Sequence, residues 1–476
     1  MTNQLNRVLN DVFGLRSLRE PQSVAIRSIL DGKHTLVIMP TGAGKSLCYQ
    51  LPAILLKGAV SSITIVLSPL IALMKDQVDS LQRKGVNATY VNSSLSRQER
   101  LDRYAAIERG EHALLYVTPE RFRKREFLDV IRHRDVRLLA IDEAHCVSQW
   151  GHDFRPDYGR VGEIRSLLGE PVTVALTATA TRECRQDILD QLQIPADDVT
   201  NVVSGIDRPN LALSIESVLG VDEKLAVIRS QIEDRSSHES GSMIVYFSLI
   251  KTLCEFRDAL AQSGHDVACY HGDLNRAERR EVQDQFMRGD KRVVLATPAF
   301  GMGIDKEDIR CVIHAETPGS IESYYQEIGR AGRDGMLSRC IWLYDQQDLL
   351  TQMQFIDWSN PNQDYYSALA DRLTNDNERC QAHGLEWLRK QLGGRGASDR
   401  RLETALGMLA RYDVIAGDQE PGCFELKNPF DLTLAAFAGN KIEEKRTRDQ
   451  KRLYSMVELA KTPEEDRQAF LRSYFA

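Results

Sequence analysis

With 476 residues, the chain is too long for one ordinary hydrophobic core and suits two or three domains. Its hydrophobic and charged fractions, 42% and 27%, are typical of a soluble globular protein, and no apolar run approaches the length of a membrane span. The net charge of −7 excludes attraction of nucleic acid by the overall field, so any such binding must depend on local basic surface.

The N-terminal stretch MTNQLNRVLNDVFG lacks the charged, apolar and small-residue regions of a signal peptide, so we expect a cytoplasmic protein. The nine cysteines are scattered without a close CxxC pair, which favours neither a disulfide framework nor a zinc cluster. Most of them, including Cys48 and Cys311, lie in apolar surroundings and are expected to be small buried hydrophobes.

Short apolar runs alternate with amphipathic stretches through the first part of the chain, as in a parallel α/β fold covered on both faces. Residues 70–85 have helical periodicity. Each expected strand ends in polar or turn residues, which places functional loops at the carboxyl edge of the sheet. The expected strands lie within 34–40, 62–69, 113–119, 137–145 and 172–180.

A second series of strands follows a linker near 207–211, where Arg208-Pro209-Asn210 disfavours a helix. These strands are expected within 242–248, 266–272, 292–298, 310–316 and 340–345. The pattern predicts two tandem parallel-sheet domains, 1–206 and 207–347, followed by a smaller, mostly helical domain, 348–476.

The last domain contains a pattern typical of a winged helix. One apolar helical face follows a candidate cap at Ser398, and DVIAG and CFELK then flank a Gly/Pro turn as in a hairpin. The face is made by Leu402, Ala405, Leu406 and Leu409. A helical accessory domain with an incidental hairpin is the alternative.

MPTGAGKS, residues 39–46, follows an expected strand and precedes an expected helix, which is the context of a phosphate-binding loop. Thr41 lies in this loop, and Gly42 and Gly44 allow backbone N–H groups to approach phosphate oxygens. Lys45 can neutralise the β- and γ-phosphates, and Ser46 can offer a hydroxyl to Mg²⁺. The alternative is a glycine-rich turn that occurs by chance.

Asp142 and Glu143 end the strand that contains RLLAI. An aspartate at this place can hold Mg²⁺, and the neighbouring glutamate can deprotonate the attacking water. An isolated Asp-Glu pair is more often a solvated turn, but together with the phosphate loop it predicts an ATP-hydrolysis site.

QEIGRAGRDG carries Arg330 and Arg333, which would share one face if this stretch were helical. Guanidinium groups stay charged and bind phosphoryl oxygens bidentately, so both arginines suit transition-state stabilisation. Taken alone, the segment would be a basic pair on a helix surface.

Eleven motifs in order resemble the RecQ family of superfamily 2 DNA helicases, over about residues 13–345. SQWGHDFRPDY, AFGMGIDK and SYYQEIGRAGRDG narrow the resemblance to RecQ. The other motifs are FGLRSLREPQ, MPTGAGKS, SPLIALMKDQV, VTPER, DEAH, LTATAT, DRPNL and YHGDL.

The resemblance implies a role for each matching position and tandem RecA-like folds for the two sheet domains. Arg19 and Gln22 match the adenine-recognising motif, although Glu20-Pro21 stand where the family usually has Pro-Gly. Arg333 is the better candidate for contact with the γ-phosphate. The remaining implied positions are Asp305 for nucleotide, His145, Gln326, Thr177 and Thr179 for coupling, and Ser68, Thr118 and Thr297 for the DNA backbone.

The aromatic-rich segment 148–160 resembles the loop with which the family senses single-stranded DNA. Trp150 and Phe154 can stack on bases of any sequence, and Arg155 can add a phosphate or cation–π contact. Burial in the core is the alternative, which we accept for Tyr158.

The resemblance fails near the end of the chain. EDRQAFLRSYFA is similar to the opening of the family's four-cysteine zinc module, but Asp466 stands where the first cysteine would be. Cys380 and Cys423 are too few for a four-ligand site, so we expect no structural zinc and no HRDC-like tail. The basic run 445–452 is a candidate for phosphate contact or a solvated helix face.

The residues and the resemblance together predict an ATP- and Mg²⁺-dependent DNA helicase moving 3′ to 5′ on single-stranded DNA and unwinding tailed or forked duplexes, in DNA repair or recombination. Membrane partners are not expected. Two rivals stay open: an RNA-remodelling ATPase, and a binding or strand-annealing protein in which ATP acts only as a switch. A motor that translocates but unwinds poorly is a weaker variant of the second.

Overall fold

The computed structural model describes residues 2–58, 60–148, 156–234, 241–301, 304, 306–394, 399, 401–411, 415–416, 425–426 and 432–476. The chain forms two compact units. The first comprises Met1–Glu316, Glu322–Leu343 and Thr462–Ala476, and the second comprises Thr317–Ile321 and Tyr344–Lys461.

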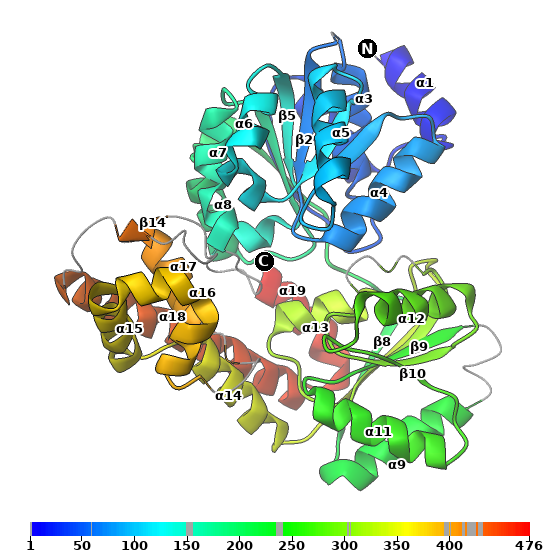
Figure 1. The fold of residues 1–476 in the computed structure, drawn as a ribbon. Helices are drawn as coiled ribbons and strands as arrows, with labels where there is room; N and C mark the ends of the chain where they lie inside the picture. Colours follow the sequence, from blue (N-terminus) through cyan, green and yellow to red (C-terminus); the bar gives the residue numbers. More distant parts are fainter. Residues whose placement is uncertain are drawn as a thin grey trace. The chain divides into compact units, whose positions relative to one another are not determined.

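The first sheet has the strand order β3-β4-β2-β5-β6-β1-β7, and all of its neighbouring strands pair in parallel. Helices cover both of its faces (Figure 1). The strands are β1 His34–Ile38, β2 Ser62–Leu67, β3 Ala88–Val91, β4 Leu114–Val117, β5 Asp135–Ile141, β6 Val172–Thr177 and β7 Val199–Val203. The helices are α1 Thr2–Phe13, α2 Glu20–Leu30, α3 Leu47–Leu56, α4 Ile71–Arg83, α5 Arg97–Glu108, α6 Arg125–Ile131, α7 Val161–Leu167 and α8 Arg182–Leu192.

Alternation along the strands divides the apolar side chains between two cores, one on each face of this sheet. In β2, Ile65 and Leu67 pack with helices α5 to α8, whereas Val66 between them packs with α2, α3 and α4. In β5, Leu139 and Leu138 divide in the same way. The near-continuous apolar runs in the sequence follow from this burial on both faces, and the prediction of a parallel α/β fold is confirmed.

The second sheet has the order β10-β11-β9-β12-β13-β8, with parallel pairing from β10 to β13. All five strands expected in this series are present. The elements are β8 Leu211–Ser217, α9 Gly220–Glu233, β9 Ser242–Tyr246, α11 Ile250–Gln262, β10 Ala268–Tyr270, α12 Arg276–Arg288, β11 Val293–Ala296, β12 Ile309–His314, α13 Ile321–Ile328 and β13 Ser338–Tyr344.

Residues 204–210 join the two sheets, since β7 belongs to the first and β8 to the second. The last helix, α19 Arg467–Phe475, packs in the same unit as the sheets. Arg467 donates to the carbonyl of Leu213 at 3.0 Å, and Arg472 pairs with Asp207 of the linker at 3.2 Å.

The second unit is mainly helical. Leu402, Ala405, Leu406 and Leu409 of α17 are buried in its core, as the apolar face predicts. The hairpin is also present, because β14 and β15 pair antiparallel; Ser398 and the tip of the hairpin lie outside the described residues. The elements are α14 Asp348–Ser359, α15 Gln363–Asn375, α16 Asn377–Gln391, α17 Arg401–Arg411, β14 Ile415–Ala416, β15 Glu425–Leu426 and α18 Leu432–Lys461.

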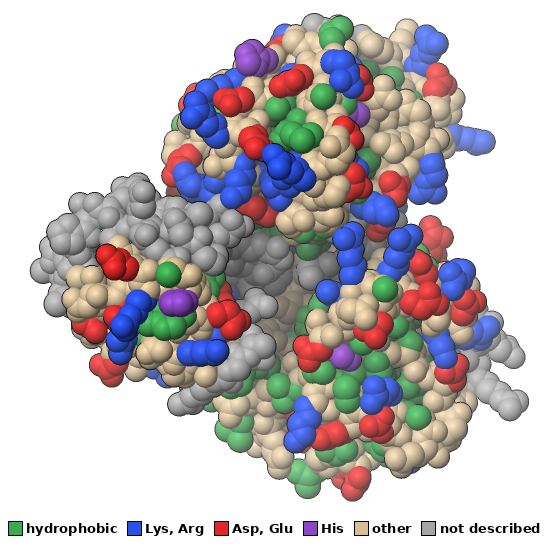
Figure 2. Space-filling model, viewed as in Figure 1, with side chains coloured by type: hydrophobic (Ala, Val, Ile, Leu, Met, Phe, Trp, Pro, Cys, Tyr) green, Lys and Arg blue, Asp and Glu red, His purple; other side chains and the backbone are tan. Residues whose placement is uncertain are grey.

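Acidic and basic side chains are interspersed on the face drawn in Figure 2. Among the helices that the structure describes, none has the length and apolarity to cross a membrane. Cys48 and Cys311 are buried, as predicted.

Candidate active site

The phosphate loop lies between β1 and α3, the strand–loop–helix context expected from its sequence. Gly42 and Gly44 have φ of +80° and +81°, values that residues with a Cβ rarely adopt. The ammonium of Lys45 donates to the carbonyl of Met39 at 3.1 Å, and burial lowers the pKa of Lys45. The loop therefore presents backbone amides and one cation at the carboxyl edge of the sheet.

The acidic pair follows β5 at the same edge. The amide of Asp142 donates to the carbonyl of Leu67, which extends the ladder between β5 and β2 by one residue. Burial, followed by the negative charge of Glu143, raises the pKa of Asp142 to about 7. Glu143 has a left-handed backbone with φ of 50°, a conformation that is uncommon for a residue other than glycine.

Two coupling candidates make direct contact. Nδ1 of His145 lies 3.0 Å from the hydroxyl of Thr177, and it lies 3.4 Å from a carboxylate oxygen of Glu143. The hydroxyl of Thr177 donates to the carbonyl of Thr179 at 3.0 Å. Hydrogen bonds thus connect His145 with the end of β6, and Glu143 lies close to the same ring nitrogen.

Gln22 lies against the phosphate loop. Its amide nitrogen donates to the carbonyls of Ala43 and Gly44, at 3.1 and 3.2 Å, and its amide oxygen accepts from the backbone N–H of Arg19. Gln22 is 6% exposed. The side chain assigned to adenine recognition is thus engaged with the loop and with the N-terminus of α2. Its role toward adenine stays a prediction.

Arg330 and Arg333 do not share a helical face, because the stretch that carries them is not part of a helix. The helix α13 ends at Ile328, before Arg330, because GRAGRDG contains three glycines and Gly332 has φ of +56°. Arg330 is buried and donates to the carbonyl of Gly301, where a Cβ would clash with its guanidinium. The methylenes of Arg333 instead pack against Gly42 of the phosphate loop. The two side chains therefore have different contact partners, Gly301 and Gly42.

A cavity in the first unit is lined by predicted residues from both sheet domains. They include Lys45, Asp142 and Glu143 of the first domain and Gln326, Arg330 and Arg333 of the second. Thr41, Gly42, Gly44, Ser46 and His145 also line it. The donor set fits a magnesium nucleotide, because amides and Lys45 suit phosphates whereas the Ser46 hydroxyl and the Asp142 carboxylate suit Mg²⁺.

The three hydroxyls expected at the DNA backbone follow strand ends, as the sequence predicts. Ser68 follows β2, Thr118 follows β4 and Thr297 follows β11. Their exposed fractions are 1%, 3% and 9%. Phosphate contact by these residues stays a prediction. Trp150, Phe154, Arg155 and Asp305 lie outside the described residues, whereas Tyr158 is buried, as expected.

Part of the basic run 445–452 is engaged within the second unit. Lys445 pairs with Asp449 at 2.9 Å and donates to the amide oxygen of Asn360 at 2.8 Å. Arg446 pairs with Asp357 at 2.9 Å. These contacts assign Lys445 to packing of α18 against α14, whereas the ion pair of Arg446 is exposed.

The described residues contain no group of three or more His, Cys, Asp or Glu side chains placed to hold a metal ion. Cys423 lies outside those residues. The expected absence of structural zinc therefore stays a prediction.

Sequence reasoning missed the contacts that hold the arginine-bearing loop. Arg208 and Asn210 were placed in a linker and in the motif DRPNL without a role of their own, yet both side chains reach the loop after α13. The signal was available in the motif DRPNL, whose polar residues exceed what a linker requires.

Two tandem parallel-sheet domains, with a phosphate loop and an acidic pair in the first and arginines in the second, are the arrangement of a two-domain nucleotide-dependent motor. The family model of the DEAD/DEAH box helicase matches residues 19–187, and that of the helicase conserved C-terminal domain matches residues 223–335. The chain belongs to the RecQ family of superfamily 2 helicases.

Two relatives from Bacillus subtilis (strain 168) support this assignment. The "ATP-dependent DNA helicase RecQ" is 44% identical over 361 residues, which are 75% of this chain and 59% of the relative. The "Probable ATP-dependent DNA helicase RecS" is 39% identical over 413 residues, which are 86% of this chain and 80% of the relative. The chain spans between 52% and 59% of the length of the bacterial RecQ relatives that it matches.

The fold is similar to that of the Mycobacterium smegmatis helicase Lhr, whose structure is bound to ssDNA and AMP-PNP. The TM-score is 0.58 at 19% sequence identity, over 90% of this chain and 60% of Lhr. At this identity the likeness concerns the fold alone.

Proposed function

We propose that the protein is an ATP-dependent DNA helicase that couples ATP hydrolysis to 3′-to-5′ translocation on single-stranded DNA and to duplex unwinding, in DNA repair or recombination. One observation carries the proposal: Arg333 of the second sheet domain packs against Gly42 of the phosphate loop and shares a cavity with Lys45, Asp142 and Glu143. A site completed by two domains lets hydrolysis depend on their relative movement.

In this proposal, Lys45 and the loop amides bind the phosphates, and Ser46 and Asp142 hold the metal ion. Glu143 orients and deprotonates the attacking water, while Arg333 stabilises charge on the transferred phosphoryl group. Mg²⁺, when bound, neutralises charge on the β- and γ-phosphates. Arg330, held at the Gly301 carbonyl, supports the second domain's side of the cavity.

His145 and Thr177 then connect the hydrolytic residues with the strand end that faces the nucleic acid. Hydroxyls at Ser68, Thr118 and Thr297 suit backbone phosphates that need positioning but not sequence readout. Trp150, Phe154 and Arg155 would report a bound strand through stacking and phosphate contact.

RNA remodelling is the second candidate, because the motor motifs are shared with RNA-dependent enzymes. The names of the relatives given above favour DNA. A comparison of ATPase stimulation by DNA and RNA strands of the same sequence distinguishes the two.

Unwinding of 3′-tailed, 5′-tailed and forked duplexes by the full chain tests the proposal. We expect 3′-tailed and forked substrates to be separated with ATP and Mg²⁺, and 5′-tailed substrates to be left intact. Lys45→Ala should abolish both DNA-stimulated ATP turnover and unwinding. Preference for the 5′ tail, or turnover that survives in Lys45→Ala, would contradict the direction or the site assignment respectively.

A further inference from the structure

The loop after α13, residues 329–338, carries both arginines and is held by a third arginine from the linker. Helix ends leave carbonyl groups without intrahelical partners, and a cation near a helix C-terminus is favoured. The guanidinium of Arg208 meets this need. It donates to the carbonyls of Gly329, Ala331 and Gly332, at 3.3, 2.7 and 3.0 Å.

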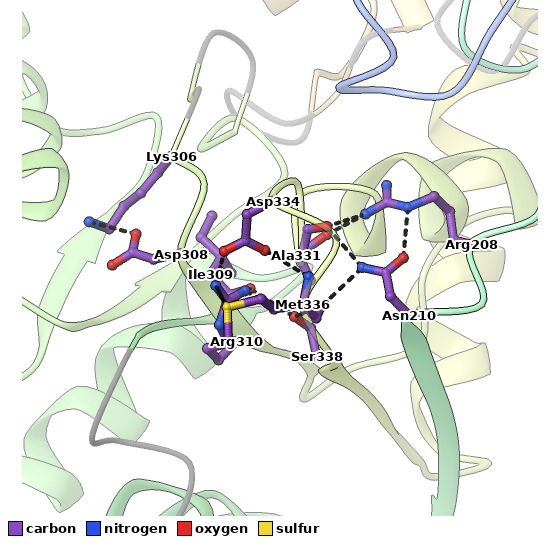
Figure 3. Close-up of polar contacts among 11 residues, drawn as sticks. Arg208, Asn210, Lys306, Asp308, Ile309, Arg310, Ala331, Asp334, Met336 and Ser338 are labelled. Atoms are coloured by element: carbon purple, nitrogen blue, oxygen red, sulfur yellow. Dashed lines mark hydrogen bonds and ion pairs between the residues drawn. The ribbon is translucent and has the colours of Figure 1, made fainter.

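Asn210, two residues further along the linker, forms hydrogen bonds with the same loop. Its amide nitrogen donates to the carbonyls of Gly332 and Met336 at 2.9 and 3.1 Å, and its backbone carbonyl accepts from the N–H of Ser338. Figure 3 shows the side chains of Arg208 and Asn210 reaching the loop side by side. A Cβ on Gly332 would clash with the Asn210 amide, so this close approach requires glycine.

The loop has a second anchor in the second sheet. Arg310 of β12 forms an ion pair with Asp334 and donates to the hydroxyl of Ser338 at 3.3 Å. The hydroxyl of Ser338 in turn donates to the carbonyl of Ile309 at 3.2 Å. Arg333 thus lies between Gly332, whose carbonyl is held by the linker, and Asp334, which is held by Arg310 of the second sheet.

Gly332 connects the contacts of the linker with Arg333, the residue proposed to act in hydrolysis. Its carbonyl accepts from both Arg208 and Asn210, and it immediately precedes Arg333. The peptide group that joins Gly332 to Arg333 is therefore fixed by two linker side chains, which sets the direction in which Arg333 leaves the backbone.

We propose that Arg208 and Asn210 are positioning residues for Arg333, and that they act by holding the loop through its carbonyl groups. This inference rests on the proposed function, which gives Arg333 its role in hydrolysis. Since Arg208 and Asn210 belong to the segment between the two sheets, a change of linker conformation alters the placement of Arg333. The linker is fastened to α13 as well, because the hydroxyl of Tyr325 donates to the carbonyl of Ile206.

A double-mutant cycle tests the inference. The variants are Arg208→Gln, Arg333→Gln and the two combined, with kcat and KM of the DNA-stimulated ATPase as readouts. We expect Arg208→Gln to lower kcat about 10- to 100-fold, since a small misplacement of a catalytic group has effects of this size, and to leave KM for ATP within about threefold. The combined variant should be no slower than Arg333→Gln, because Arg208 acts through Arg333.

The matched control is Arg229→Gln. Arg229 also donates to a backbone carbonyl of the second sheet domain, that of Ala259 at 3.4 Å, but it does not reach the loop. Its kcat should stay within about twofold of the parent chain. Arg208→Lys keeps the charge but replaces the planar guanidinium, which uses two nitrogens here, with a single ammonium nitrogen, so its kcat should fall between those of Arg208→Gln and the parent.

The outcomes separate the two proposals. If Arg333→Gln is inactive while Arg208→Gln matches Arg229→Gln, the inference falls and the proposed function stands. If Arg333→Gln keeps full turnover, the proposed role of Arg333 in hydrolysis is wrong, and the inference about Arg208 is wrong as well. A combined loss equal to the product of the single losses would also overturn the inference, because Arg208 would then act independently. Should Arg208→Gln fail to fold, Asn210→Ala enters the same cycle with the same expectations.

Discussion

Nδ1 of His145 lies 3.0 Å from the hydroxyl oxygen of Thr177, and both side chains are buried. His145 belongs to the segment after β5 and Thr177 ends β6, so the contact joins two strand ends that lie side by side in the sheet. Glu143, the proposed base, is 3.4 Å from the same nitrogen. Glu143 and Thr177 therefore lie close to the same ring nitrogen, so a movement of Glu143 can act on the end of β6 through His145.

Thr177→Val should uncouple hydrolysis from unwinding. Valine keeps the volume and β-branching of threonine but removes the hydroxyl that meets His145 and the carbonyl of Thr179. We expect basal ATP turnover to stay within about threefold and duplex unwinding to fall by about 10-fold or more. Parallel ATPase and strand-separation assays decide, with Thr173→Val as control, since Thr173 is a buried threonine of the same strand whose hydroxyl donates to the carbonyl of Pro171. Equal loss in both assays would refute a coupling role.

The strand ends were predictable from sequence because burial on both faces leaves a simple signature. Apolar runs such as ITIVL stop where a polar residue must face solvent or ligand, which located Ser68 and Asp142 at the sheet edge. β7 escaped detection because it is short and only Val202 of its five residues is buried.

Gly44→Ala tests the contact between Gln22 and the phosphate loop. Gly44 has φ of +81°, and a Cβ there would come within 2.5 Å of the Gln22 amide nitrogen. Gly32 has the same φ but no atom within 4 Å of an added Cβ, so Gly32→Ala isolates the backbone strain. We expect both variants to lose about 1 kcal/mol of stability and only Gly44→Ala to weaken ATP binding, by about 10-fold or more. Thermal melts and nucleotide titrations measure the two effects, and similar ATP affinities in the two variants would disprove the contact's importance.

Which side chains meet across the fold could not be inferred from spacing. The arginines are three residues apart, which suggested one helical face, but the glycines end α13 first and the two side chains diverge. Likewise, Arg208 and the carbonyl of Ala331 are 123 positions apart and meet only because β8 pairs into the second sheet. The local sequence pattern predicts where strands end, whereas long-range packing determines which side chains contact each other.

Glu327→Ala should strongly destabilise the second sheet domain. The Glu327 carboxylate lies 2.7 Å from Nε2 of His314, with both side chains almost fully buried, so its removal leaves a buried ring nitrogen without this partner. We expect a loss of about 3 kcal/mol in the free energy of unfolding. Asp11→Ala removes the exposed pair with Arg7 and should cost under about 0.5 kcal/mol. Denaturant unfolding of the two variants gives the comparison, and equal midpoints would show that the buried pair contributes nothing.

Trp150→Ala should remove the response to DNA while leaving the hydrolytic site intact. Trp150 follows the acidic pair by seven residues, and an indole can stack on a base of any sequence. We expect basal ATP turnover to persist, while stimulation by single-stranded DNA falls about 10-fold or more, because one stacked base contributes about 1–3 kcal/mol to binding. Tyr158→Phe is the matched control: the ring of Tyr158 is buried in the core of the first sheet domain, so it should respond to DNA as the parent does. Titration of ATPase rate against strand concentration separates weaker binding from weaker maximal stimulation, and a Trp150→Ala variant with normal values of both would remove this segment from the DNA site.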